Sequence, residues 1–254
     1  MKIHSHSAIV TGGGSGLGEA VARELARQGA KVAVIDINGA NAERVAAEIG
    51  GTAFSADITD TASLTAALDA AEARHGTARI VMNIAGIGTA KRVIGKDGNP
   101  AALEDFERVI RINLIGTYNV VRLTAARIAR LEPLDDGERG VMLMTASVAA
   151  YDGQVGQEAY SASKGGIVAL TLPLARDLAQ HGIRVCTVAP GLFATPLMQQ
   201  LPEAVQQSLA ASIPFPRRLG QPQEFAALAA HIVVNGHLNG EVIRLDGALR
   251  MAPR

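Results

Sequence analysis

The chain is poor in the residues that define several common protein classes. It has one cysteine, Cys186, no tryptophan and three tyrosines among 254 residues. A single cysteine excludes an intrachain disulfide and a cysteine metal cluster. The apolar stretch around Cys186, IRVCTVAP, favours a buried core thiol over a nucleophile. His4 and His6 alone are weak evidence for a metal site, so we expect none.

A charge excess and long hydrophobic runs are also missing. The 24 Lys and Arg residues balance 24 Asp and Glu residues, so we expect no nucleic-acid partner. No apolar run reaches the roughly 18 residues that suggest a membrane span. The start, MKIHSHSAIVTGGG, has no apolar segment typical of a signal peptide. We therefore expect a cytoplasmic, soluble protein without a membrane partner.

Short apolar segments alternate with longer helix-like segments along the chain. The helix-like segments, such as 18–29 and 61–76, have apolar residues at helical spacing and a glycine at their ends. The strand candidates are apolar at both parities, as in a parallel sheet covered on both faces. These candidates are residues 7–12, 31–36, 52–57, 79–86, 140–147, 183–190 and 241–247. The pattern predicts a single-domain α/β protein over residues 1–254, a Rossmann doubly wound parallel sheet of about seven strands with helices on both faces.

Two segments do not fit this alternation. Residues 86–103 directly follow a strand end, where open α/β sheets bind ligands. Residues 191–222 are long enough to form a small helical lid over a substrate.

A glycine-rich turn, TGGGSGLG, joins the first strand to the first helix. Its pattern is TGxxxGxG, with Gly12, Gly16 and Gly18 at the key positions. Such glycines allow a tight turn and a close approach of the backbone to a pyrophosphate at a helix N-terminus. The turn matches neither G-x-G-x-x-G nor a P-loop. A tight turn without a ligand is the alternative interpretation.

Acidic residues end the second and third strands. Asp36, twenty positions after Gly16, can accept hydrogen bonds from both ribose hydroxyls of an adenosine and would repel a 2′-phosphate. No arginine lies within residues 35–41, which favours NAD over NADP. Asp57 is placed to meet the adenine amino group, with Ile58 against the ring. The alternative for Asp36 is a helix N-cap or a turn residue, and the alternative for Asp57 is an acid that caps the following helix.

Tyr160 and Lys164 are four residues apart and share one face of a predicted helix. A nearby ammonium lowers the pKa of a phenol from its ordinary value of about 10. Such a tyrosine can exchange a proton with an alcohol or a carbonyl, while hydride transfer belongs to a nicotinamide. Ser147, at a strand end thirteen residues earlier, can hold the substrate oxygen. Gly165 and Gly166 each cost about 1 kcal/mol in a helix, which indicates a close approach by a backbone or ligand.

With these motifs in order, the chain resembles the short-chain dehydrogenase/reductase superfamily of the classical type. The resemblance rests on TGGGSGLG, Asp36, NIAG, RINLIGT, TAS, YSASK and APG, and it covers essentially the whole chain. It implies a catalytic tetrad of Asn113, Ser147, Tyr160 and Lys164. Tyr160 would be the acid/base and Ser147 would orient the substrate oxygen. Lys164 would lower the Tyr160 pKa and bind the nicotinamide ribose, and Asn113 would hold a water of the proton relay.

The same resemblance implies an NAD site and a homotetramer, with the apolar residues 241–253 suited to a subunit contact. NIAG departs from the family's usual NNAG at Ile84, which puts one local hydrogen bond in doubt but not the fold. The expected cofactor-binding residues are Gly12, Ser15, Gly16, Leu17, Gly18, Asp36, Asp57, Ile58, Asn83, Ala85, Gly86, Tyr160, Lys164, Pro190, Gly191 and Thr195.

A closer resemblance concerns the substrate. Residues 145–179, 189–197, 214–220 and 238–251 are similar to the type II 3-hydroxyacyl-CoA dehydrogenases. This implies NAD-dependent oxidation of (S)-3-hydroxyacyl-CoA esters, branched ones included, in fatty-acid and branched-chain amino-acid degradation. The alternatives are an NAD-dependent alcohol, sugar or hydroxysteroid dehydrogenase, and a dinucleotide sensor without catalysis.

The expected acyl-CoA site has two parts. Gln154 and Gln157 flank the expected cleft and would join Ser147 and Tyr160 as substrate residues, unless they are solvated loop residues. The basic loop residues Lys91, Arg92 and Lys96 either attract the CoA phosphates or form a solvated surface.

Overall fold

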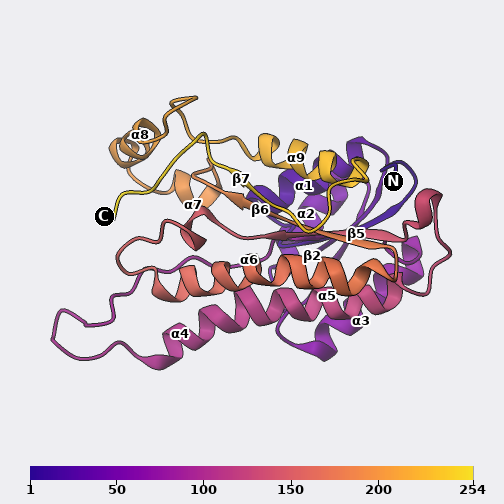
Figure 1. The fold of residues 1–254 in the computed structure, drawn as a ribbon, viewed down its shortest axis with the longest axis horizontal. Coiled ribbons are helices and arrows are strands. Elements are labelled where there is room, and N and C mark those ends of the chain that lie inside the picture. Colours follow the sequence, from indigo (N-terminus) through magenta and orange to yellow (C-terminus); the bar gives the residue numbers. More distant parts are fainter. Residues whose placement is uncertain (254) are drawn as a thin grey trace.

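A seven-stranded parallel sheet forms the centre of the molecule (Figure 1). The computed structural model describes residues 1–253. The sheet order is β3-β2-β1-β4-β5-β6-β7, and every neighbouring pair is parallel. The strands are β1 (Ser7–Thr11), β2 (Lys31–Asp36), β3 (Thr52–Ser55), β4 (Ile80–Asn83), β5 (Gly140–Thr145), β6 (Ile183–Pro190) and β7 (Val242–Leu245). The strand order reverses between β1 and β4, and ligands of such sheets bind at the carboxyl ends beside that point.

Helices connect the strands, as the alternating pattern predicts. They are α1 (Gly16–Arg27), α2 (Gly39–Ile49), α3 (Thr61–His75), α4 (Leu103–Ile110), α5 (Thr117–Ile128), α6 (Glu158–Ala179), α7 (Pro196–Gln199), α8 (Glu203–Ala211) and α9 (Pro222–Val234). A π-helical segment, η1 (Arg111–Gly116), joins α4 to α5, and short 3₁₀ turns lie at η2 (Asp135–Gly137) and η3 (Val148–Ala150). The expected single-domain doubly wound fold is confirmed.

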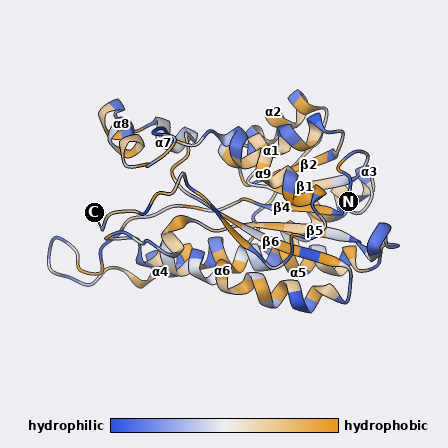
Figure 2. Ribbon diagram, turned by 45° about the horizontal axis from the view of Figure 1, so that its top comes forward, coloured by the Kyte–Doolittle hydropathy of each residue, from blue (hydrophilic) through white to orange (hydrophobic). Residues whose placement is uncertain are grey.

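Each face of the sheet buries its own hydrophobic core. In β5, Val141 and Leu143 join the core under α1, α2 and α9, whereas Met142 and Met144 join the core under α3, α5 and α6. Both parities of the strand are therefore apolar because both faces are covered. Hydrophobic colour runs along the strands in Figure 2, while the helices carry hydrophilic residues as well.

The irregular segments gather at one end of the molecule. Helices α7 and α8, the loop between β4 and α4, and the C-terminal segment lie there in both views (Figures 1 and 2). The expected lid region, residues 191–222, contains α7 and α8, and its closure over a substrate stays a prediction. Within residues 1–253, no helix combines the length and apolarity needed to cross a membrane.

Candidate active site

A cavity of about 550 Å³ opens at the carboxyl ends of the central strands. Its walls come from the β1–α1 turn, the ends of β2, β4, β5 and β6, and the start of α6. The predicted site residues that line it are Gly12, Ser15, Gly16, Leu17, Gly18, Asp36, Asp57, Ile58, Ala85, Gly86, Tyr160, Lys164, Pro190 and Thr195.

The glycine-rich turn leaves the start of α1 open toward this cavity. Ser15 occupies the N-cap position but makes no side-chain capping bond, whereas Asn38 and Asp60 cap α2 and α3. The first N–H groups of a helix have no partner within the helix, so those of α1 can receive an anionic group. Gly12 is required for close packing, since a Cβ there would lie 2.7 Å from the Cα of Ala85. The structure therefore fits a dinucleotide pyrophosphate at this turn.

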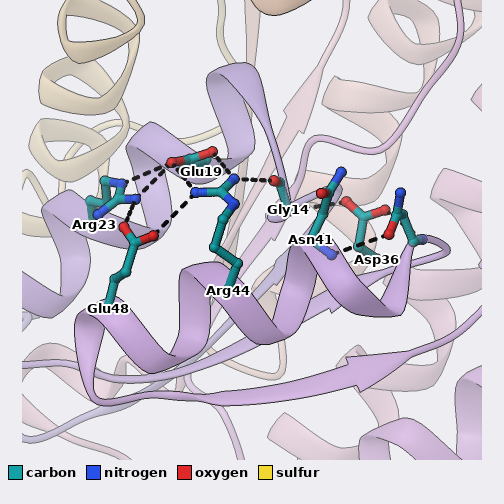
Figure 3. A network of polar contacts seen from close by, with 8 residues as sticks. Gly14, Glu19, Arg23, Asp36, Asn41, Arg44 and Glu48 are labelled. Carbon is teal, nitrogen blue, oxygen red and sulfur yellow. Dashed lines mark hydrogen bonds and ion pairs between the residues drawn. The ribbon is translucent and has the colours of Figure 1, made fainter.

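Asp36, at the end of β2, lines the cavity, and Figure 3 shows its side chain beside Gly14 and the start of α2. Its Oδ2 accepts a hydrogen bond from the Gly14 N–H at 3.0 Å, and its Oδ1 accepts one from the Asn38 N–H at 2.9 Å. A carboxylate has further lone pairs for a ribose. Asp36 does not cap α2, because Asn38 is the cap and accepts from the Asn41 N–H at 3.1 Å. The contact from the Asn38 N–H fits the other alternative, in which Asp36 stabilises the turn before α2.

Asp57 lines the cavity next to Ile58 and accepts from the Thr59 N–H at 2.8 Å. The cap of α3 is Asp60, so capping does not explain Asp57 either. A Cβ on Gly116 would lie 2.8 Å from the Ile58 side chain. The absence of a side chain at Gly116 thus lets Ile58 sit against η1 while it forms the cavity wall.

Tyr160, Lys164 and Ser147 come together where α6 begins. The Lys164 side chain is buried, and its Nζ donates to the Thr145 carbonyl oxygen at 2.7 Å. This Nζ lies 5.8 Å from the centroid of the Tyr160 ring. The Ser147 hydroxyl lies near the phenol of Tyr160 and acts to lower the pKa of that phenol. A surface tyrosine–lysine pair is therefore excluded, and the three groups can act on one substrate oxygen.

The ionisation of this group departs from the expectation in one respect. Burial raises the pKa of Tyr160, and the hydroxyl of Ser147 only partly opposes that change. Burial also lowers the pKa of Lys164 to about 8. The pKa of Tyr160 is thus raised and not lowered as expected, while the Lys164 ammonium donates to the Thr145 carbonyl. Additional positive charge is needed to favour the phenolate.

Asn113 lies in η1 and is fully buried. Its Oδ1 accepts from the Ile87 N–H at 2.8 Å, and its Nδ2 donates to the Ile87 carbonyl at 2.9 Å and to Ser163 Oγ at 3.1 Å. Ser163 in turn donates to the Tyr160 carbonyl at 2.7 Å. Both amide donors are thus used to tie the loop after β4 to α6. A relay water bound to Asn113 would therefore have to donate a hydrogen bond to the side-chain or the backbone carbonyl oxygen of Asn113.

Close packing explains one of the two helix glycines. A Cβ on Gly166 would lie 2.8 Å from the Leu114 side chain of η1, so α6 and η1 need a glycine there. A Cβ on Gly165 would meet nothing within 4 Å among the described residues.

Six predicted residues are not part of the cavity wall, namely Asn113 and Ser147, described above, and Asn83, Gly191, Gln154 and Gln157. Asn83 is buried, and its side-chain amide has no hydrogen-bond partner among residues 1–253. Gly191 packs on Asp246, whose Cβ would lie 2.8 Å from an added Cβ. Gln154 Nε2 donates to the Ala252 carbonyl at 2.9 Å, and Gln157 Oε1 accepts from the Gln154 N–H at 3.0 Å.

The positions of Gln154 and Gln157 do not support their expected substrate roles. The two side chains form hydrogen bonds within their own loop and to the C-terminal segment, and neither lines the cavity. The sequence did not point to several further lining residues. Four of them lie within recognised motifs and could have been found there, namely Ile84 in NIAG, Ile112 in RINLIGT, and Thr145 and Ala146 in TAS. The others are Ile35, Ile37, Ala56, Ile87, Gly88, Arg108 and Pro196.

The fold, the open helix start and the pairing of Tyr160 with the buried Lys164 define a dinucleotide-dependent oxidoreductase of the Rossmann type. Comparison with known proteins identifies the family. A sequence profile described as short chain dehydrogenase matches residues 6–206, and the chain belongs to this family.

Individual relatives match nearly the whole chain. A 3-hydroxyacyl-CoA dehydrogenase type-2 from Drosophila melanogaster is 52% identical over 96% of this chain and 97% of its own. A crystal structure of 3-hydroxyacyl-CoA dehydrogenase type-2 from Mycobacterium avium is 46% identical, with a TM-score of 0.94 over 98% of this chain and 97% of its own. A 3-ketoacyl-(acyl-carrier-protein) reductase from Brucella melitensis, complexed with NADH, is 32% identical, with a TM-score of 0.87 over 98% of this chain and 100% of its own. A nicotinamide dinucleotide is therefore the cofactor class of this fold.

Proposed function

We propose that the protein oxidises (S)-3-hydroxyacyl-CoA esters to 3-ketoacyl-CoA esters with NAD. The grouping of Ser147, Tyr160 and Lys164 beside the cavity supports alcohol oxidation. The substrate class is supported by the 52% identity to a 3-hydroxyacyl-CoA dehydrogenase type-2 over nearly both chains. This full-length similarity carries the proposal.

Ser147, Tyr160 and Lys164 have separate roles in the proposed oxidation. When bound, NAD supplies a positively charged nicotinamide that accepts the hydride from C3. Ser147 holds the 3-hydroxyl oxygen beside Tyr160. The phenolate of Tyr160 takes the hydroxyl proton as the C3 carbonyl forms. The positive charge of the nicotinamide would favour the phenolate of Tyr160 and so oppose the burial that raises its pKa. Lys164, anchored on the Thr145 carbonyl, is placed to hold the nicotinamide ribose.

A preference for NAD over NADP is part of the proposal. Asp36 offers a carboxylate at the end of β2, where a ribose would lie and a 2′-phosphate would be repelled. Titration of the free protein with NADH and NADPH, followed by cofactor fluorescence, tests this preference. Tighter binding of NADPH would contradict it.

We propose that exposed cations of the loop after β4 bind the phosphates of CoA. Lys91 pairs with Asp105, and its N–H anchors the loop on the Gly156 carbonyl at 2.7 Å. Arg92 and Lys96 are exposed and have no partner among residues 1–253. These two cations are therefore better placed than Lys91 to meet a phosphate.

The double substitution Arg92→Ala/Lys96→Ala tests the CoA-binding role. It should raise KM for the CoA ester and leave KM for the N-acetylcysteamine thioester unchanged. Lys91→Ala, with its partnered lysine, is the matched comparison and should have a smaller effect. Equal rises in KM for both thioesters would contradict the role.

The decisive experiment follows NADH formation from (S)- and (R)-3-hydroxybutyryl-CoA, a polyol and a hydroxysteroid. We expect turnover of the (S)-ester and its loss in Tyr160→Phe, with NADH binding retained in the variant. Turnover of the polyol or steroid alone would favour the alternative dehydrogenases. Binding of NADH without any turnover would favour a sensor. Unchanged turnover in Tyr160→Phe would refute the mechanism.

The homotetramer and the cytoplasmic location stay proposals. Leu103, Phe106, Ile115 and Tyr118 expose large apolar side chains along α4, η1 and α5, which supports a subunit contact on this face. Light scattering on the purified protein tests the assembly, and cell fractionation tests the location.

A further inference from the structure

A cation lies beside the glycine-rich turn, and it comes from outside residues 35–41, the segment whose lack of arginine favours NAD. Arg44 extends from α2 to the glycine-rich turn, where its Nη2 donates to the Gly14 carbonyl oxygen at 3.1 Å. The N–H of the same Gly14 donates to Asp36 Oδ2 at 3.0 Å. Figure 3 shows both side chains meeting this residue. A guanidinium and the carboxylate expected to read the ribose therefore flank one residue of the turn.

Glu19 of α1 holds this guanidinium in place. Its Oε2 accepts from Arg44 Nη2 at 2.7 Å, and its Oε1 accepts from Nη1 at 3.1 Å, which is a two-point contact. Glu48 adds a longer contact to Nη1 at 3.4 Å. Arg23 binds both Glu19 and Glu48, so the two arginines and two glutamates form a cluster without net charge.

The least exposed member of the cluster is Glu19. Its side chain is 21% exposed, against 46% for Arg44 and 45% for Glu48. The hydrogen bond from Arg44 is the main cause that lowers the pKa of Glu19, so the carboxylate stays ionised at neutral pH. Glu19 is the central anion of the cluster, and its charge keeps Arg44 turned to Gly14.

We propose that Glu19 is a specificity-determining residue that excludes NADP by holding Arg44 away from the 2′-position of the ribose. This inference rests on the proposed function, since it assumes a dinucleotide with its adenosine at Asp36. Arginine binds a phosphate well when two parallel N–H groups of its guanidinium are available. With Arg44 engaged by Glu19 and Gly14, only the repulsion from Asp36 acts on a 2′-phosphate. Without Glu19, Arg44 gains the freedom to pair with that phosphate.

Dinucleotide binding to the free protein tests the proposal. In Glu19→Ala we expect the affinity for NADPH to rise at least about tenfold, or about 1.4 kcal/mol, with that for NADH within about twofold of wild type. Glu19→Gln, which keeps the shape and removes the charge, should change the NADPH affinity in the same direction. The gain in NADPH affinity should shrink as salt is added, because it comes from a partly exposed ion pair between Arg44 and the 2′-phosphate. Glu24→Ala is the matched control, since it removes an acid from the same helix that pairs with Arg27 instead.

The double variant Glu19→Ala/Arg44→Ala separates release of Arg44 from simple loss of a negative charge. We expect it to return to the wild-type affinity for NADPH, and Arg44→Ala alone to leave that affinity unchanged. A double variant that keeps the gain would overturn the proposal, and so would a Glu19→Ala protein with an unaltered NADPH to NADH ratio. Failure of the proposed function gives a different result, namely intact dinucleotide binding without turnover of any hydroxyacyl-CoA.

Discussion

Replacement of Lys164 by methionine should abolish most activity and yet stabilise the protein at neutral pH. The ammonium is buried and its pKa falls from 10.5 to about 8. At about 1.4 kcal/mol per pKa unit, the folded protein carries an unfavourable charge burial of about 3 kcal/mol below pH 8. Loss of the hydrogen bond to the Thr145 carbonyl offsets about 2 kcal/mol of the gain. We expect a net increase of about 1 kcal/mol, or about 3 °C in Tm.

The pH dependence separates this cause from a general packing effect. Between pH 8 and 10.5 the folded protein has a neutral Lys164, while the unfolded chain keeps its proton. The unfolded state then binds more protons, so wild-type stability from this group rises with pH. The stability difference between variant and wild type should be largest below pH 8 and shrink above it.

Urea unfolding at pH 7, 8.5 and 10 measures the difference. Lys31→Met, which replaces an exposed lysine by the same residue, is the matched control and should change stability little at any pH. A Lys164→Met protein that is less stable than wild type at pH 7 would refute the reasoning. A constant difference across the three pH values would also refute it.

Three further predictions concern packing, a buried ion pair and catalysis. Gly166→Ala places a Cβ 2.8 Å from a leucine of η1 and should lower stability by about 1–3 kcal/mol. Gly165→Ala, which meets nothing nearby, should raise stability by up to about 1 kcal/mol. Thermal melts of both variants check this, and equal effects would contradict it. Glu138→Ala removes the partner, at 2.8 Å, of the buried Arg184 and should cost about 3–5 kcal/mol in urea unfolding with dinucleotide affinity retained in the folded fraction. Because burial raises the pKa of Tyr160, the proposed acid/base, the rate of alcohol oxidation should rise with pH from 6 to 9 and that of carbonyl reduction should fall. Flat profiles in initial-rate assays would contradict this.

The strands were predictable because burial on both faces makes their residues uniformly apolar. The expected strands 52–57 and 79–86 end early, at Ser55 and Asn83. The residues that follow these ends, such as Asp57 and Ala85, turn away from the sheet to line the cavity. Local pattern therefore locates the elements and the cleft better than the last residue of each strand.

Contacts between distant segments were beyond the sequence. Glu19–Arg23 and Arg44–Glu48 are visible as pairs four residues apart on a helix, but nothing in that spacing joins one helix to the other. Gln154 was expected in the cleft, and its partner instead lies 98 residues further along the chain. The spacing of Tyr160 and Lys164 likewise predicts a shared face but not the direction in which Nζ points.

The π-helical segment η1 has a consequence for the chain's tolerance of length changes. A π turn holds one residue more than an α turn, and one residue corresponds to a rotation of about 100° around a helix. Deletion of a single residue within 111–116 would therefore turn the buried side chains of α5, such as Val120 and Thr124, away from the sheet. A substitution at the exposed Ile115 changes no such rotation. In chimaeras or grafts that join α4 of one homologue to α5 of another, the number of residues between the helices must be kept, even where their identities are free to vary.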